Sequence, residues 1–142
     1  NAADDILVKE LHLPVGRKVN FMMRSQDVLH SAYMPHFRAQ MNCVPGMITQ
    51  FSFTPTITTE EMRRNPDVVE KVKRTNAIRA KRAAEGQPNS EPWEFDYVLL
   101  CNKICGKSHY NMQMKIIVET EEEYNKWIAE QATFKETLAP AE

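Results

Sequence analysis

The chain of 142 residues has almost no net charge and no long apolar run, and both absences narrow its class. A formal net charge of −1 is too small to favour binding to nucleic acid or to an anionic membrane surface. The longest near-continuous apolar run, residues 97–101, has the length of a strand and not of a membrane span. The N-terminus also lacks the basic and apolar regions of a signal peptide. The composition is that of a globular domain with its own hydrophobic core.

Cysteine is scarce as well, and the three cysteines make an odd number. A closed framework of disulfides is therefore not expected. Cys101 and Cys105 could pair with each other in an oxidised chain that holds no metal. Cys43 stands apart from them, and we expect it to be a small buried apolar residue.

Short apolar segments separated by turn residues predict a β fold. Pro-Val-Gly at 14–16 and Val-Pro-Gly at 44–46 are expected turns. There is no regular alternation of strands and helices, so we expect one all-β sandwich or barrel over residues 1–142. The expected strands are 6–13, 19–24, 28–34, 47–53, 95–100 and 114–118.

Residues 56–92 break this pattern, because they are strongly polar and carry no strand signal. Asn65-Pro66-Asp67 supplies an N-cap, a proline at the first helical position and an acid in the first turn. Gly86 is a plausible stop. We expect a partly helical insertion whose charged surface is solvated, in preference to a dedicated docking helix.

A second helix is expected at residues 120–132. Thr120 and Glu123 form a capping-box pattern at its start. Tyr124, Trp127 and Ile128 then share one helical face, which we expect to pack on the sandwich.

The richest chemistry lies between residues 101 and 112. Cys101, Cys105, His109 and Met112 bring two thiols, an imidazole and a thioether together within twelve residues. These soft donors select copper over magnesium, calcium or manganese. Their spacing allows them to converge from one tight loop on a single point.

Two other chemistries compete for this loop. A structural zinc site would accept the two thiols with His109 and His30, but it has no use for Met112. A redox dithiol usually has two residues between its cysteines at a helix start in a βαβ unit, and neither condition holds here. His12 and His36 lack a partner motif and are expected to be ordinary core or surface residues.

An upstream segment extends the pattern. Asp27-Val28-Leu29-His30-Ser31 is followed by Met34-Pro35 and Val44-Pro45-Gly46. Together with the spacing of the downstream loop, including Gly106 after the second cysteine, it resembles the binuclear copper (CuA) domain of cytochrome c oxidase subunit II. The resemblance implies a cupredoxin-like Greek-key β-sandwich, here with a helical insertion and a C-terminal helix.

The resemblance also implies a ligand set for two copper ions and no catalytic residue. Cys101 and Cys105 would bridge the ions, and His30 and His109 would each bind one of them. Met112 would be a weak axial ligand on one ion. The backbone carbonyl of Lys103 would be the weak ligand on the other.

By the same resemblance, the chain would accept electrons from a cytochrome c or an equivalent donor. It would pass them to the haem of catalytic subunit I, in an oxygen-reducing, proton-translocating oxidase of the respiratory chain. The domain would face the periplasm, and an N-terminal membrane hairpin, absent from this chain, would anchor it to the cell inner membrane. Trp93 and Trp127 lie outside the segment that carries the family's electron-accepting tryptophan, so neither is given that role.

Several positions depart from the family pattern. Lys103 replaces a glutamate whose carboxylate helps to bind magnesium, and a cation cannot ligate that metal. Asn42 and Met47 replace an aspartate and an arginine that flank the Val-Pro-Gly turn. The 56–92 segment is longer than the usual connection.

Three alternatives to the oxidase stay open. The CuA domain of a nitrous oxide reductase has the same ligands and a different electron acceptor. A zinc-stabilised binding module would be colourless and hold one metal ion. A copper chaperone would hold one exchangeable copper and usually has a thioredoxin-like fold, which the β pattern opposes.

Overall fold

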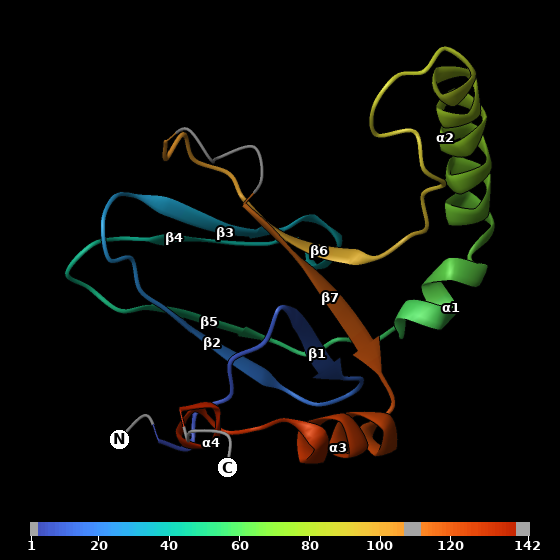
Figure 1. Ribbon diagram of the computed structural model, residues 1–142. Coiled ribbons are helices and arrows are strands. Elements are labelled where there is room, and N and C mark those ends of the chain that lie inside the picture. The colour runs from blue at the N-terminus through green and yellow to red at the C-terminus, as the bar shows by residue number, and fades with distance from the viewer. Residues whose placement is uncertain (1–2, 107–111, 139–142) are drawn as a thin grey trace.

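The computed structural model describes residues 3–106 and 112–138, and most of its regular structure is β (Figure 1). Its strands are β1 (Glu10–Pro14), β2 (Val19–Met23), β3 (His30–Met34), β4 (Ala39–Cys43), β5 (Thr49–Phe53), β6 (Tyr97–Cys101) and β7 (Gln113–Glu119). Its helices are the 3-10 turn η1 (Pro35–Phe37), α1 (Thr59–Arg64), α2 (Pro66–Ala84), α3 (Glu121–Glu130) and α4 (Phe134–Thr137).

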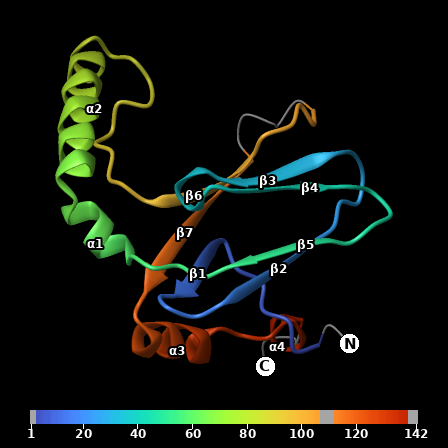
Figure 2. The ribbon, with the colours of Figure 1, turned by 180° about the vertical axis from the view of Figure 1, so that it is seen from behind.

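The strands form two layers. One sheet has the order β1-β7-β6-β3-β4, and the other contains β2 and β5. Neighbouring strands are antiparallel except for β1 and β7, which are parallel. The chain crosses to the smaller sheet at β2 and again at β5 and returns to the larger sheet after each of them, and both views show β2 and β5 facing the other sheet (Figures 1 and 2). The predicted all-β sandwich is confirmed.

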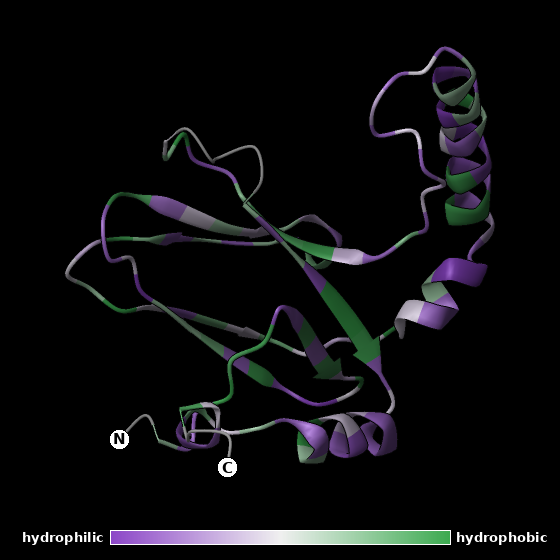
Figure 3. Ribbon diagram, viewed as in Figure 1, coloured by the Kyte–Doolittle hydropathy of each residue, from purple (hydrophilic) through white to green (hydrophobic). Residues whose placement is uncertain are grey.

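The core lies on the inner face of the larger sheet. Six residues there are at most 3% exposed: Leu13, Met34, Phe95, Tyr97, Ile116 and Val118. Figure 3 shows hydrophobic colour along β6 and β7, whereas α1 and α3 are largely hydrophilic. Because side chains alternate along a strand, Leu99 and Cys101 lie on the same face of β6 as the buried Tyr97. The core face of β6 therefore ends at a cysteine.

The strand predictions were wrong at two places. The first strand begins at Glu10 and not at residue 6, since Ile6 makes only an isolated bridge to Thr133. Strand β4 was missed, although its alternate residues Ala39, Met41 and Cys43 follow the strand period. Alanine and methionine have little β preference, so the pattern there is weak, and pairing with β3 along its whole length stabilises the strand.

The predicted helical insertion forms, and polar contacts hold it to the sandwich. The Asn65 side chain accepts a hydrogen bond from the Asp67 backbone at 3.0 Å, and Gly86 follows the helix with a φ of 69°. Arg63 in α1 donates to the Phe95 carbonyl at 2.9 Å and pairs with Asp96 at 2.8 Å. Helix α1 itself, with a capping box at its start, was not predicted.

The C-terminal helix also begins with its predicted capping box. Trp127 stacks on His12 with ring centroids 4.2 Å apart, and the His12 ring pairs with Glu119 at 2.8 Å. His12 is thus a packing residue, as its sequence context indicates. Among the described residues, no helix combines the length and the hydropathy needed to cross a bilayer.

Replacing Trp127 with alanine tests whether this stacking holds α3 on β1. Because Trp127 is only partly buried, we expect the free energy of unfolding to fall by about 2 kcal/mol. Lys126→Ala is the matched control, since Lys126 is exposed on the same helix and should change stability little. Chemical denaturation of both variants gives the two values, and equal stabilities would contradict the assignment.

Candidate metal centre

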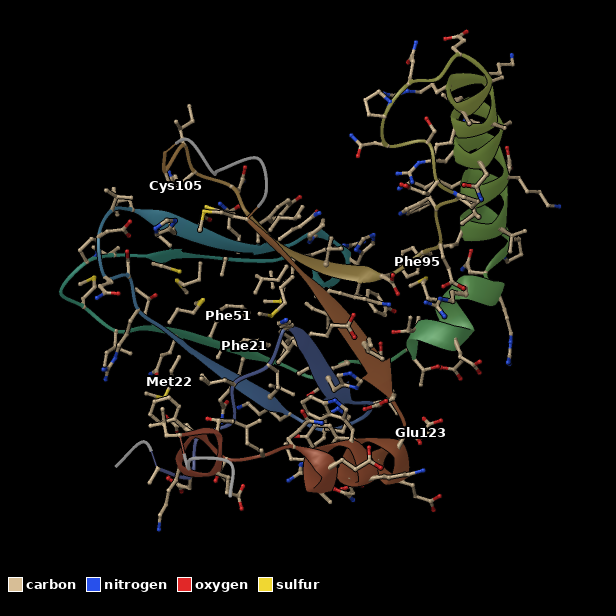
Figure 4. The ribbon with its side chains drawn as sticks, in the orientation of Figure 1. Phe21, Met22, Phe51, Phe95, Cys105 and Glu123 are labelled. Atoms are coloured by element: carbon tan, nitrogen blue, oxygen red, sulfur yellow. The ribbon has the colours of Figure 1, made fainter. Side chains whose placement is uncertain are left out.

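Three strands bring the predicted ligands to one end of the sandwich. His30 is the first residue of β3, Cys101 is the last of β6, and Met112 immediately precedes β7. Register places Ala32 of β3 opposite Cys101, and the Cys101 amide donates to the Met112 carbonyl at 3.0 Å. The loop that carries Cys105 therefore leaves and returns at neighbouring points of the sheet (Figure 4).

The donor atoms lie close together. Cys101 Sγ is 3.7 Å from His30 Nδ1 and 3.6 Å from Cys105 Sγ. The donor atoms of these three residues all lie within 4.8 Å of one another. A metal at about 2.3 Å from each sulfur would separate two sulfurs by at most about 4.6 Å, so one ion can bind both thiols.

Two of the remaining predicted ligands, Met112 and Lys103, lie within the described residues. Met112 Sδ lies 3.1 Å from Cys105 Sγ, and the Lys103 carbonyl oxygen is 3.5 Å from Cys101 Sγ. Both positions are close enough to extend the group of donors. His109 lies outside the described residues.

Asp27 orients the histidine. Its Oδ1 lies 2.9 Å from His30 Nε2, while Nδ1 of the same ring faces Cys101. A carboxylate at one ring nitrogen keeps the proton there and leaves the other nitrogen to bind a metal. The contacts with Asp27 and then with Cys101 raise the pKa of His30, and the bond to His30 lowers the pKa of Asp27. This second-sphere role was missed, and its only sequence signal is the three-residue spacing before His30.

The two thiols differ in acidity. Burial opposes ionisation of Cys101, but hydrogen bonds with the backbone at Ser31 and Lys103, followed by His30, outweigh it and lower the pKa to about 6. Burial, followed by the neighbouring Cys101 sulfur, raises the pKa of Cys105. Cys101 is therefore the thiolate at neutral pH, which is the form that binds a metal.

The other candidate residues from the sequence, Cys43 and His36, make packing contacts. Cys43 is buried, as predicted, and lies opposite His30 across the β3–β4 pair. His36 packs edge-on against Phe95 and Tyr97, and burial lowers its pKa. Among residues 3–106 and 112–138, only His30, Cys101 and Cys105 form a metal-competent group of histidine, cysteine or carboxylate side chains.

The chain resembles known proteins. The family described as the periplasmic domain of cytochrome c oxidase subunit II matches residues 4–61. The alternative cytochrome c oxidase subunit 2 of Bradyrhizobium diazoefficiens is 36% identical over 133 residues, covering 92% of this chain and 35% of the relative. Cytochrome c oxidase subunit 2 of Thermostichus vulcanus is 26% identical over 123 residues, covering 86% of this chain and 26% of the relative. The chain thus spans about a third or less of the length of these relatives.

Solved structures share the fold. The periplasmic domain of cytochrome oxidase subunit II from Bradyrhizobium japonicum superposes with a TM-score of 0.56 at 18% identity, covering 84% of this chain and 61% of that one. A mixed disulfide between a thioredoxin-like protein and such a domain gives a TM-score of 0.54 at 18% identity, covering 92% of this chain and 64% of that one. The predicted cupredoxin-like sandwich is confirmed by these likenesses.

Alkylation of the metal-free protein tests the difference between the thiols. Since thiolate is the reactive form, the rate at Cys101 should be half-maximal near pH 6 and fall about tenfold for each unit below it. The rate at Cys105 should still rise with pH above neutrality. Mass spectrometry of each cysteine after iodoacetamide treatment measures both rates, with buried Cys43 as the internal control. Faster reaction at Cys105 in neutral solution would contradict the assignment.

Proposed function

Because the chain belongs to the family of cytochrome c oxidase subunit II periplasmic domains, we propose that it holds a binuclear copper centre that relays single electrons. The observation that carries the proposal is the convergence of two thiols and an imidazole within 4.8 Å at the end of a rigid β-sandwich. A mononuclear blue-copper site uses one thiolate, so the second thiol is what favours two ions. Copper itself follows from the family and from the soft donors.

The proposed ligands are those that the sequence pattern predicts. Cys101 and Cys105, as thiolates, and His30 and His109 would hold the two copper ions. Met112 and the Lys103 carbonyl would be weak ligands. Bound there, two copper ions would supply one-electron transfer in which the change of charge is spread over both metals.

The protein's own part is to hold these donors still and to set their protonation. Strands β3, β6 and β7 place three of them through backbone hydrogen bonds. Asp27 keeps the His30 proton on Nε2, and the low pKa of Cys101 supplies a thiolate without a base. The work is outer-sphere electron transfer, which needs neither a substrate pocket nor a general acid.

The proposed partners follow from the family. A cytochrome c or an equivalent donor reduces the centre, and the haem of catalytic subunit I accepts the electron within an oxygen-reducing oxidase. The domain works on the periplasmic side of the cell inner membrane, anchored through a part of the full-length protein outside this chain. The alternative acceptor, a nitrous oxide reductase, is less favoured because the relatives are oxidase subunits.

Two consequences concern this particular loop. Lys103 replaces the family's glutamate, and we propose that its ammonium contributes no ligand to a magnesium site at the subunit boundary.

The thiols of Cys101 and Cys105, 3.6 Å apart, are also close enough to oxidise to a disulfide with small movements. A thioredoxin-like protein, of the kind seen in a mixed disulfide with the related domain, would reduce that disulfide before copper binds.

Copper loading with paramagnetic resonance tests the centre. The wild-type protein should bind two copper ions and show one unpaired electron coupled equally to both. Cys101→Ser and Cys105→Ser should each abolish that signal, because either change removes a bridge. Cys43→Ala is the control, since it removes the third thiol and should keep the spectrum.

The same samples separate the rival functions. A signal localised on a single copper nucleus would contradict the binuclear centre. A colourless protein that retains one zinc ion and rejects copper would favour the zinc-stabilised binding module.

Asp27→Ala tests the orienting carboxylate. Without it, the His30 ring loses its fixed tautomer, and copper affinity should fall about tenfold or more. Glu122→Ala removes an exposed carboxylate far along the chain and should leave the affinity unchanged. Competition with a copper chelator measures both variants, and equal affinities would exclude a role for Asp27.

A further inference from the structure

Ser31, the residue that follows His30 on β3, is a buried polar residue next to the metal centre. Only 1% of it is exposed. Because side chains alternate along a strand, Ser31 lies on the opposite face of β3 from His30. A buried hydroxyl destabilises the fold unless it makes a hydrogen bond. The Ser31 side chain therefore needs a partner on the outer face of the larger sheet.

Gln40 on β4 is that partner. Its Nε2 donates a hydrogen bond to the Ser31 Oγ at 3.1 Å. In the β3–β4 register, Ser31 lies opposite Asn42, two residues after Gln40. Ser31 and Gln40 are therefore diagonal neighbours on one face of the sheet, within reach of a long side chain. Strand β4 is an edge of the sheet, so an exposed side chain of the edge strand holds a buried hydroxyl beside a metal ligand.

The backbone of Ser31 faces the other neighbouring strand, β6. The Asn102 amide, just past the end of β6, donates to the Ser31 carbonyl at 3.2 Å. The amide and the carbonyl of one residue point the same way in an antiparallel ladder, so the Ser31 amide also faces the end of β6. A backbone hydrogen bond joins Ser31 to the Cys101 sulfur. Since a thiolate can only accept, the Ser31 amide is the donor in that bond.

We propose that Gln40 is a positioning residue, which acts through Ser31 to hold the Ser31 amide on the Cys101 sulfur and thereby raises the reduction potential of the copper centre. An amide that donates to a thiolate draws electron density from the sulfur, and this favours the reduced form of a bound metal. The effect on the potential rests on the proposed function, whereas the positioning of the amide does not.

The size of the effect is limited by a second donor. The backbone at Lys103 also bonds with the Cys101 sulfur, and it belongs to the loop that follows β6. That bond does not depend on Gln40 or on the Ser31 hydroxyl. Loss of Gln40 should therefore shift the potential without abolishing the centre.

Hydrogen exchange of the metal-free protein tests the positioning directly. In Gln40→Ala the Ser31 amide should exchange about fivefold faster, the factor that corresponds to one neutral hydrogen bond. Gln50→Ala is the matched control, because Gln50 is an exposed strand residue on β5 of the smaller sheet. Nuclear magnetic resonance measures the exchange rate of this amide in each variant. An unchanged rate in Gln40→Ala, or the same acceleration in Gln50→Ala, would overturn the proposal.

Redox titration of the copper-loaded protein, followed by its visible absorption, tests the effect on the potential. Ser31→Ala and Gln40→Ala should each shift the one-electron equilibrium about threefold toward the oxidised form, which is about 28 mV. The double variant should shift it no further, because both changes remove the same bond. Gln50→Ala should keep the wild-type potential. An unchanged potential in Ser31→Ala and Gln40→Ala, or shifts that add in the double variant, would overturn the tuning role.

The two measurements separate this proposal from the proposed function. Gln40 is exposed, so Gln40→Ala should fold like the wild-type protein, which circular dichroism checks. If the loaded wild-type protein showed no binuclear centre, the proposed function would fail. Exchange at Ser31 in the metal-free chain would still decide whether Gln40 positions the amide.

Discussion

The pairing of β3 with β6 is the constraint on which the site depends. Through it, His30 and Cys101, 71 residues apart in the chain, come within 3.7 Å. Backbone hydrogen bonds set this distance, and the buried neighbours Met34 and Tyr97 hold the strands on the core. A one-residue slip of β6 would turn Cys101 to the opposite face of the sheet. The strand pairing that packs the core therefore also positions the metal ligands.

Charge at the site follows the same geometry. The His30 ring lies between Asp27 and Cys101. The Asp27 carboxylate favours the protonated ring, and the ring in turn favours the Cys101 thiolate. Cys105 lies beside Cys101, and its ionisation is disfavoured by the sulfur that ionises first. The two thiols therefore lose their protons in two separate steps as the pH rises. Of the two thiols, only Cys105 must therefore lose a proton as metal binds at neutral pH.

The insertion and the C-terminal helix surround the sandwich without reaching the metal ligands. Arg63 ties the base of the insertion to the Phe95 carbonyl, just before the central strand β6, and Trp127 stacks on His12 of the edge strand β1. Both stabilise the larger sheet, whose strands carry the site.

The sequence by itself determined the soft donor set, most strands and both main helices, because spacing, alternation and caps are local. It could not reveal β4, whose residues become a strand only through pairing with β3. Nor could it reveal that Asp27 orients His30. Those relations join residues far apart in the chain or depend on side-chain direction, which only the packing of the two sheets decides.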